Sequence, residues 1–134
     1  MAAIAISTRS TVELLARDVV AAAHEVHRCL GPGLAASAYR ECLCHELRLR
    51  GVVFDREVAV PLRYKGVPLD TAGRLDLVVA GCIAVAVQRT NRLAPIQAAH
   101  LLTCLRLKRL PLGLLIDFNA ASIKGGIVRI ANTT

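Results

Sequence analysis

The sequence predicts an α/β domain in which helices flank a mixed sheet of about five strands, in the order α-α-β-β-β-α-β-β. Three observations support this. Two stretches with helical spacing of apolar residues come first. Strand-like segments separated by glycine turns follow, and a third helical stretch then leads into a continuous apolar run, which is typical of a buried central strand. No linker or repeat divides the 134 residues, so we expect one domain over 1–134, with residues 1–9 disordered or loosely attached.

Two helices are expected in the N-terminal part. The first begins at Ser10, because Ser10 and Glu13 have the capping-box spacing. Its inward face carries apolar residues at helical spacing: Val12, Leu15, Val19, Ala22, Val26 and Cys29 or Leu30. Gly31-Pro32 ends this helix, and a second one is expected over about 34–50.

The middle of the chain predicts three strands. Alternation over 57–64 indicates a half-buried strand, and Pro61 places it at or near a sheet edge. After a turn at Lys65-Gly66, the next strand covers 74–79. It alternates one set of side chains, Leu75, Leu77 and Val79, with another, Arg74, Asp76 and Val78. The chain returns as a strand over 82–88.

The C-terminal part predicts one helix and two strands. Pro95 is suited to the first turn of a helix that ends before Pro111. The apolar run 112–118 is the buried central strand. A turn at 124–126 leads into a last strand over 127–130.

The composition favours self-association. Apolar residues make up 54% of the chain and aromatic residues 3%, so the core consists of Ala, Leu, Val and Ile. This apolar excess is more than a small monomer hides, because a small domain leaves much of its surface exposed. We expect a homo-oligomer, at least a dimer, through the first two helices or an edge strand such as Val58–Tyr64.

The formal net charge is +7, with 14 Arg and 3 Lys against 10 acidic residues. Such a balance suits a polyanionic partner, although charges this dispersed are equally consistent with a solvated surface. If nucleic acid is bound, the candidate residues are Arg89, Arg92, Arg106, Lys108 and Arg109. Aromatic residues are too few for a base-stacking platform.

The five cysteines, an odd number without CxxC spacing, predict reduced thiols that fill the core of a cytoplasmic protein. They are Cys29, Cys42, Cys44, Cys82 and Cys104. Neither a secretory signal nor a run of about 18 apolar residues is found, so no membrane partner is expected. His24 and His27, like the group around His45, lack a spacing that imposes four zinc ligands, so no metal site is expected.

The hairpin around Gly81 carries the chemical argument. A three-residue loop at 80–82 pairs positions whose numbers sum to 162, which sets Asp76 opposite Ala86 with Cβ atoms about 5 Å apart. Ala86 and Gln88 share a face. A carboxylate and a lysine at these two positions would form a metal site beside a cation. Asp76 alone is a poor Mg²⁺ site, and we expect it to pair with Arg74, Arg89 or solvent.

Several motifs in order resemble the bacterial GxxExxY proteins, a branch of the PD-(D/E)XK nuclease-like superfamily. They are Glu25–Leu34, Ser37-Ala38-Tyr39, Tyr64-Lys65-Gly66, Arg74–Leu77, Leu93-Ala94-Pro95 and Leu112–Asn119. The resemblance runs from about Leu14 to Asn132 and implies a PD-(D/E)XK nuclease-like core.

The same resemblance implies that the activity is lost. The Glu in the family's name falls on Ala36, and the Glu and Lys of its ExK signature fall on Ala86 and Gln88. The signature residues that remain are Gly33, Tyr39 and Asp76. No catalytic residue, metal or cofactor is therefore expected. We expect an inactive relative that acts by self-assembly or by binding, including non-specific nucleic-acid binding.

One alternative stays open. The chain could be a metal-dependent DNA or RNA nuclease with a displaced Mg²⁺ site, in which Asp76 acts with Glu25 or Glu41. Such an enzyme needs a second carboxylate within about 4 Å of Asp76.

Overall fold

The computed structural model describes residues 2–69, 73–89 and 94–133. Its helices and strands, in chain order, are α1 (Ala2–Leu30), α2 (Ala36–Leu49), β1 (Phe54–Ala59), β2 (Leu62–Tyr64), β3 (Val67–Leu69), β4 (Arg74–Val79), β5 (Ile83–Val87), α3 (Ala94–Lys108), β6 (Leu112–Ile116), the 3₁₀ turn η1 (Lys124–Gly126) and β7 (Ile127–Ala131).

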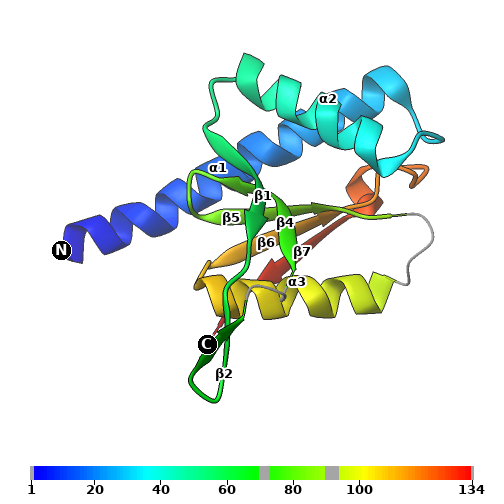
Figure 1. Ribbon diagram of the computed structural model, residues 1–134. Helices are drawn as coiled ribbons and strands as arrows, with labels where there is room; N and C mark the ends of the chain where they lie inside the picture. Colours follow the sequence, from blue (N-terminus) through cyan, green and yellow to red (C-terminus); the bar gives the residue numbers. More distant parts are fainter. Residues whose placement is uncertain (1, 70–72, 90–93, 134) are drawn as a thin grey trace.

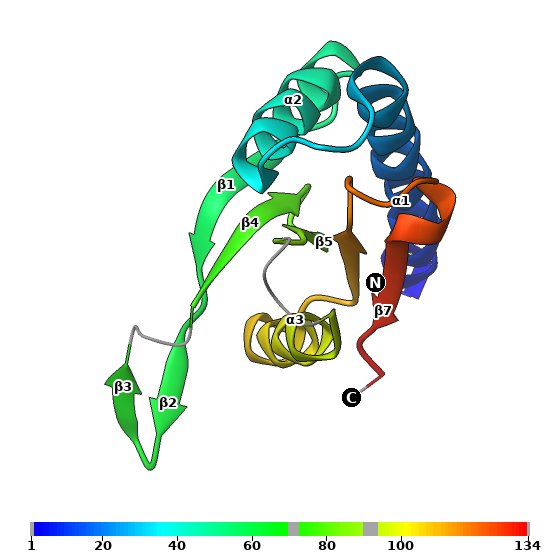
Figure 2. The same cartoon turned by 90° about the vertical axis from the view of Figure 1, so that its right-hand side faces the viewer.

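Five strands form one mixed sheet with the order β1-β4-β5-β6-β7. The β5–β6 pair is parallel and the other three pairs are antiparallel. Helices α1 and α2 lie on one face of this sheet and α3 covers the other (Figures 1 and 2). The predicted fold class is confirmed. The parallel pair needs a crossover, and α3 supplies it between β5 and β6.

Each face of the sheet has its own apolar core. Under α1 and α2, the core includes Val19, Leu43 and Leu77, and α3 packs Leu101 and Leu105 on the opposite face. Aliphatic side chains dominate both cores, as the composition predicts. The sheet is thus covered on both sides, and its two outer strands, β1 and β7, remain as open edges.

The prediction for the first helix is wrong at its start and right at its end, since α1 ends at Leu30, directly before Gly31. Helix α1 begins at Ala2, so Ser10 and Glu13 lie within the helix and not at its first turn. Residues 2–9 include three alanines, which favour continuation of the helix. At the other end Cys29 and Leu30 are exposed. The turn that follows is exposed as well, so the last turn of α1 lies at the rim of the core.

The strand predicted over 57–64 is two strands in two different sheets. Strand β1 is an edge strand of the main sheet, as Pro61 indicated, and β2 pairs with β3 in a separate hairpin. The break falls at Val60, whose N–H donates to the carbonyl of Gly73, and at Pro61, which has no N–H. Lys65 and Gly66 turn the hairpin with φ of 50° and 85°, as a two-residue type I′ turn requires.

In both β1 and β4, the side chains switch from one face of the sheet to the other at the same point along the paired strands. On a regular strand Leu75 and Leu77 would share a face, as would Phe54 and Val58. Instead Leu77 and Phe54 pack under α1 and α2, whereas Leu75 and Val58 pack toward α3. The predicted alternation is therefore wrong at Leu75.

The switch of face occurs at Glu57 in β1 and at the neighbouring Asp76 in β4. Glu57 has φ of 51°, a left-handed conformation that is rare for a residue other than glycine. The left-handed residue accounts for the change of face in β1.

Candidate functional site

The β4–β5 hairpin has the predicted register. Leu77 pairs with Val85 and Val79 with Ile83, so the paired numbers sum to 162 and the loop is 80–82. The same register sets Asp76 opposite Ala86. Here the side chain of Asp76 replaces the backbone as hydrogen-bond partner, since its Oδ2 accepts from the N–H of Val87 at 2.8 Å. This carboxylate is therefore anchored to β5.

The second oxygen of Asp76 faces Arg40 of α2. Arg40 Nη1 lies 3.3 Å from Asp76 Oδ1, and the two side chains are only 22% and 19% exposed. The expected partners Arg74 and Arg89 are thus not the ones found. Arg74 instead donates to the carbonyl of Glu57 at 3.2 Å. Spacing along the chain could not reveal this pair, because 36 residues separate its members.

A second carboxylate shares the same guanidinium. Arg40 Nη1 lies 3.8 Å from Glu57 Oε1. The pairs Arg56–Leu77 and Val58–Leu75 flank Glu57 and Asp76, so the register brings these two acidic residues side by side. Like charges at such positions repel each other, and the guanidinium of Arg40 offsets that repulsion.

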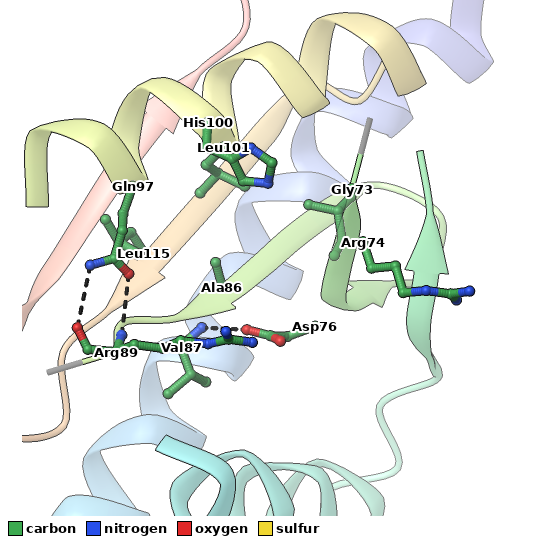
Figure 3. A pocket seen from close by; sticks show the side chains of 11 residues that line it. Gly73, Arg74, Asp76, Ala86, Val87, Arg89, Gln97, His100, Leu101 and Leu115 are labelled. Carbon is green, nitrogen blue, oxygen red and sulfur yellow. Dashed lines mark hydrogen bonds between the residues drawn. The ribbon is translucent and has the colours of Figure 1, made fainter. Parts of the chain in front are cut away.

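Asp76 also lines an open cavity of about 280 Å³ under α3. The residues around it, shown in Figure 3, are Gly73, Arg74, Leu75, Asp76, Ala86, Val87, Arg89, Gln97, His100, Leu101 and Leu115. Asp76 is the only carboxylate among these described lining residues, and Ala86 contributes a methyl group. The wall is therefore more cationic than anionic.

The polar side chains of α3 at this cavity are fixed by local contacts. Gln97 accepts from the N–H of Arg89 at 3.2 Å and donates to its carbonyl at 3.4 Å, so it closes the chain after β5 onto the helix (Figure 3). His100 lies 3.5 Å from Cys104 Sγ and fills the space beside Gly73, where an added Cβ would be 3.0 Å from the ring.

Tyr39 and Gly33, two residues on which the sequence resemblance rests, both make structural hydrogen bonds. The hydroxyl of Tyr39 donates to the carbonyl of Gly31 at 2.6 Å and accepts from the N–H of Leu34 at 3.1 Å. Its ring is buried and stacks on Phe118 at 4.8 Å. The N–H of Gly33 donates to Asn119 Oδ1 at 2.7 Å.

These contacts fasten the turn between α1 and α2 to the segment that follows β6. Asn119 also donates to the carbonyl of Leu34 at 3.3 Å, a role that sequence reasoning missed. The available signal was that Asn119 ends the run Leu112–Asn119, one of the motifs that carry the sequence resemblance.

Ala36 and Gln88, where the resemblance implies a Glu and a Lys, do not line the cavity in the part of the chain that the structure describes. Ala36 is in the first turn of α2, partly buried against the core under α1 and α2. It precedes Arg40 by four residues, which is one helical turn. The N–H of Gln88 donates to the carbonyl of Ile116 at 2.7 Å, and Gln88 is not among the described residues that line the cavity.

The candidate nucleic-acid residues that the structure describes line two different hollows or neither. Arg89 lines the cavity, whereas Arg106 and Arg109 line a separate hollow with Leu110, Pro111 and Asn132. Lys108 is half-buried at the last turn of α3. Arg92 lies outside the described residues.

The acidic residues of the alternative site are engaged elsewhere. Glu25 accepts from Arg28 at 2.8 Å, and this hydrogen bond lowers the pKa of Glu25. Glu41 pairs with Arg56, which lowers the pKa of Glu41 in the same way. Neither lies among the described residues around the cavity.

The arrangement of a mixed sheet between helices, with a strand carboxylate on its central hairpin, agrees with a comparison of the sequence. A family model described as the PD-(D/E)XK nuclease superfamily matches residues 13–130. The chain belongs to this superfamily. No curated protein and no solved structure matches the chain.

Membership in the PD-(D/E)XK nuclease superfamily raises the question of a catalytic metal. The residues present do not fit one. The two adjacent carboxylates, Asp76 and Glu57, already share the guanidinium of Arg40. Within the described part of the chain, no three His, Cys, Asp or Glu residues are grouped so that they could hold an ion. The residue opposite Asp76 on β5 is Ala86, whose side chain cannot bind a metal.

All five thiols are free, and burial raises the pKa of Cys44 and of Cys104. Cys29 is exposed, contrary to the expectation of a core position.

Among the helices that the structure describes, none combines the length and the hydropathy needed to cross a membrane.

Proposed function

We propose that this member of the PD-(D/E)XK superfamily is catalytically inactive and acts by self-assembly. The observation that carries the proposal is the guanidinium of Arg40 shared by Asp76 and Glu57, opposite Ala86. The guanidinium of Arg40 lies between these two carboxylates and occupies space that a metal ion would need for metal-dependent hydrolysis.

The contacts made by the carboxylate of Asp76 support the proposed inactivity. One of its oxygens accepts from the N–H of Val87 and the other faces Arg40. A carboxylate held in this way offers few free lone pairs to a metal or a water. Mg²⁺ normally needs one or two available carboxylates. Gln88, with a neutral amide, cannot supply the positive charge that a lysine would bring.

Self-assembly is supported by the exposed apolar surface. Large apolar side chains are exposed at the turns around α2 and on the β2–β3 hairpin: Leu34, Leu49, Val53, Tyr64, Val67 and Leu69. The strand β7, at the second open edge, adds an exposed Val128. Exposed apolar side chains that gather on one element, as on the β2–β3 hairpin, are typical of contact sites between proteins.

The test of inactivity is a cleavage assay on duplex DNA, single-stranded DNA and RNA with Mg²⁺ or Mn²⁺. We expect no metal-dependent product above a no-protein control. The matched control is Asp76→Asn, prepared in the same way, so that a contaminating nuclease gives equal cutting in both samples. Metal-dependent cleavage that disappears in Asp76→Asn would refute inactivity.

The test of assembly is mass measurement by light scattering at micromolar concentration in ordinary salt. We expect at least twice the chain mass of 14.3 kDa. A stable interface of this kind buries about 1,200 Å² or more in total. A monomeric mass over the whole concentration range would refute self-assembly.

A second candidate function, non-specific binding of nucleic acid, is supported by Arg89 at the cavity and by the net charge of +7. Binding of this kind weakens steeply with salt, with a log–log slope of about −0.9 per phosphate contact on duplex DNA. Arg89→Gln would reduce that slope by about 1 if Arg89 contacts a phosphate. Absence of binding at about 50 mM salt would exclude this function.

A further inference from the structure

We infer that the arm, the hairpin formed by residues 62–69, is the contact through which a second copy of this chain docks. The inference rests on the proposed self-assembly and names its surface. The arm extends from the end of the main sheet beside α3, away from α1 and α2 (Figure 2). Its strands β2 and β3 pair only with each other among the described strands.

The arm is apolar where a solvated hairpin would be polar. Tyr64 is 61% exposed, Val67 55% and Leu69 41%. These three lie within six residues of one another, next to Pro68. An isolated two-stranded hairpin is marginally stable at best, so an arm without a covering partner gains little from its own side chains. A partner surface that buries them would stabilise it.

An apolar hollow at the base of the arm provides such a surface. It is lined by Ala59, Val60, Pro61, Pro68 and Leu69. A symmetric dimer uses one patch on both subunits, so the apolar side chains of each arm would lie on the hollow of the other copy. The type I′ turn at Lys65-Gly66 fixes the arm, which limits the entropy lost on docking.

The charges on the two sides of the hollow make the surface self-complementary. Lys65 at the tip and Asp55 on β1 are each four or five residues from the hollow, which is about 15 Å at the rise of a strand. Both are exposed. A two-fold axis through the hollow brings the Lys65 tip of each copy to the level of Asp55 of the other. The charged residues of the arm, Arg63 and Lys65, are both basic, and residues 62–69 include no acidic residue.

The experiment is a charge exchange followed by sedimentation or light scattering over a concentration series. Lys65→Asp and Asp55→Lys are expected to weaken dimerisation about 30-fold each, because each reversal places two like-charge pairs in the interface. The double variant, which carries both changes, restores the dimer to within about three-fold of the original affinity. Lys124→Asp, an equal charge change on an exposed residue of η1, is the matched control and leaves the affinity unchanged.

A spectroscopic variant keeps the inference testable if charge changes disturb the turn. The chain has no Trp, so Tyr64→Trp places a single indole on the arm. Its emission is expected to shift to shorter wavelength as the protein concentration rises through the dimerisation range, because docking removes the ring from water. Asp is tolerated at the positive φ of Lys65, so the first variant should retain the turn.

The outcomes separate this inference from the proposal on which it rests. A monomeric original protein would refute both. An oligomer that is unaffected by Lys65→Asp, with no shift of the indole emission, would refute the arm and leave self-assembly standing. An oligomer that dissociates on nuclease treatment, with nucleic acid in the same peak, would also overturn the inference, since nucleic acid and not the arm would then hold the copies together.

Discussion

Replacement of Arg40 by methionine is the most direct test of the candidate site. The substitution keeps an unbranched side chain of similar length in α2 and removes only the guanidinium. Asp76 and Glu57 then lie side by side with no cation between them. We expect the free energy of unfolding to fall, because the partly buried carboxylate of Asp76 then remains beside the half-exposed Glu57 without their common partner.

The magnitude follows from the geometry. At 3.3 Å and an effective dielectric constant of about 20, the Arg40–Asp76 attraction alone is about 5 kcal/mol before desolvation is subtracted. Exposed pairs contribute about 0–1 kcal/mol, and truncation of one member of a fully buried pair costs about 3–5 kcal/mol. Both side chains here are about one-fifth exposed, so we expect a loss of about 2 kcal/mol.

The assay is urea unfolding of Arg40→Met, Asp76→Asn and the double variant, with a coupling energy of about 1 kcal/mol expected from the cycle. Arg28→Met is the matched control, because Arg28 pairs with Glu25 on the exposed surface of α1 and its loss should cost less stability than the loss of Arg40. Equal losses in the two arginine variants, or strict additivity of the cycle, would refute the reasoning.

The same variant tests the incompatibility with a metal. With Arg40 removed, Mn²⁺ can approach Asp76 and Glu57 and should raise the unfolding midpoint of Arg40→Met. The original protein should show no such shift. A Mn²⁺-dependent shift in the original protein would mean that the guanidinium does not exclude a divalent ion.

Three further results are expected. Tyr39→Phe should cost about 2 kcal/mol in urea unfolding, since it leaves the carbonyl and N–H bonded by the hydroxyl unpaired; a loss below about 0.5 kcal/mol would contradict this. Gly113→Ala should cost about 1 kcal/mol, because an added Cβ would lie 3.1 Å from leucine side chains of α3, and an unchanged midpoint would be the contrary result. At pH 8 an alkylating reagent should modify Cys29 at least about 100-fold faster than Cys44 or Cys104, whose thiol pKa burial raises; mass spectrometry of partly modified protein would reveal comparable rates if the expectation fails.

The predicted hairpin register agrees with the structure because its determinants are local. Gly81 and a three-residue loop fix which residues of β4 and β5 face each other, and alternating apolar residues continue the pairing. The position of Asp76 opposite Ala86 follows directly. An edge strand was also predicted from Pro61, and β1 is one, although Pro61 lies two residues beyond β1 and marks the end of that strand.

The remaining features depend on groups that are distant along the chain. The Arg40–Asp76 contact joins α2 to β4 and depends on how the helix packs over the sheet. Glu57 adopts φ of 51°, a conformation that no propensity assigns to glutamate. The division at Pro61 into an edge strand and an arm is equally invisible in the alternation, since apolar residues continue at the same spacing on both sides. Local rules therefore identify the strand carboxylate and do not identify its partner.

Ala36, Ala86 and Arg40 all affect whether Asp76 could bind a metal. Ala36 lies one helical turn before Arg40, and residues at that spacing share a helix face. A glutamate at position 36 would compete with Asp76 for the guanidinium, whereas an alanine leaves Arg40 free to reach β4. Ala86 has the complementary effect, because a carboxylate there would add a third negative charge beside Asp76. It follows that restoring acidic residues at these two positions would not by itself recreate a metal site. Arg40 would still neutralise the carboxylates, so recovery of metal binding requires its removal as well.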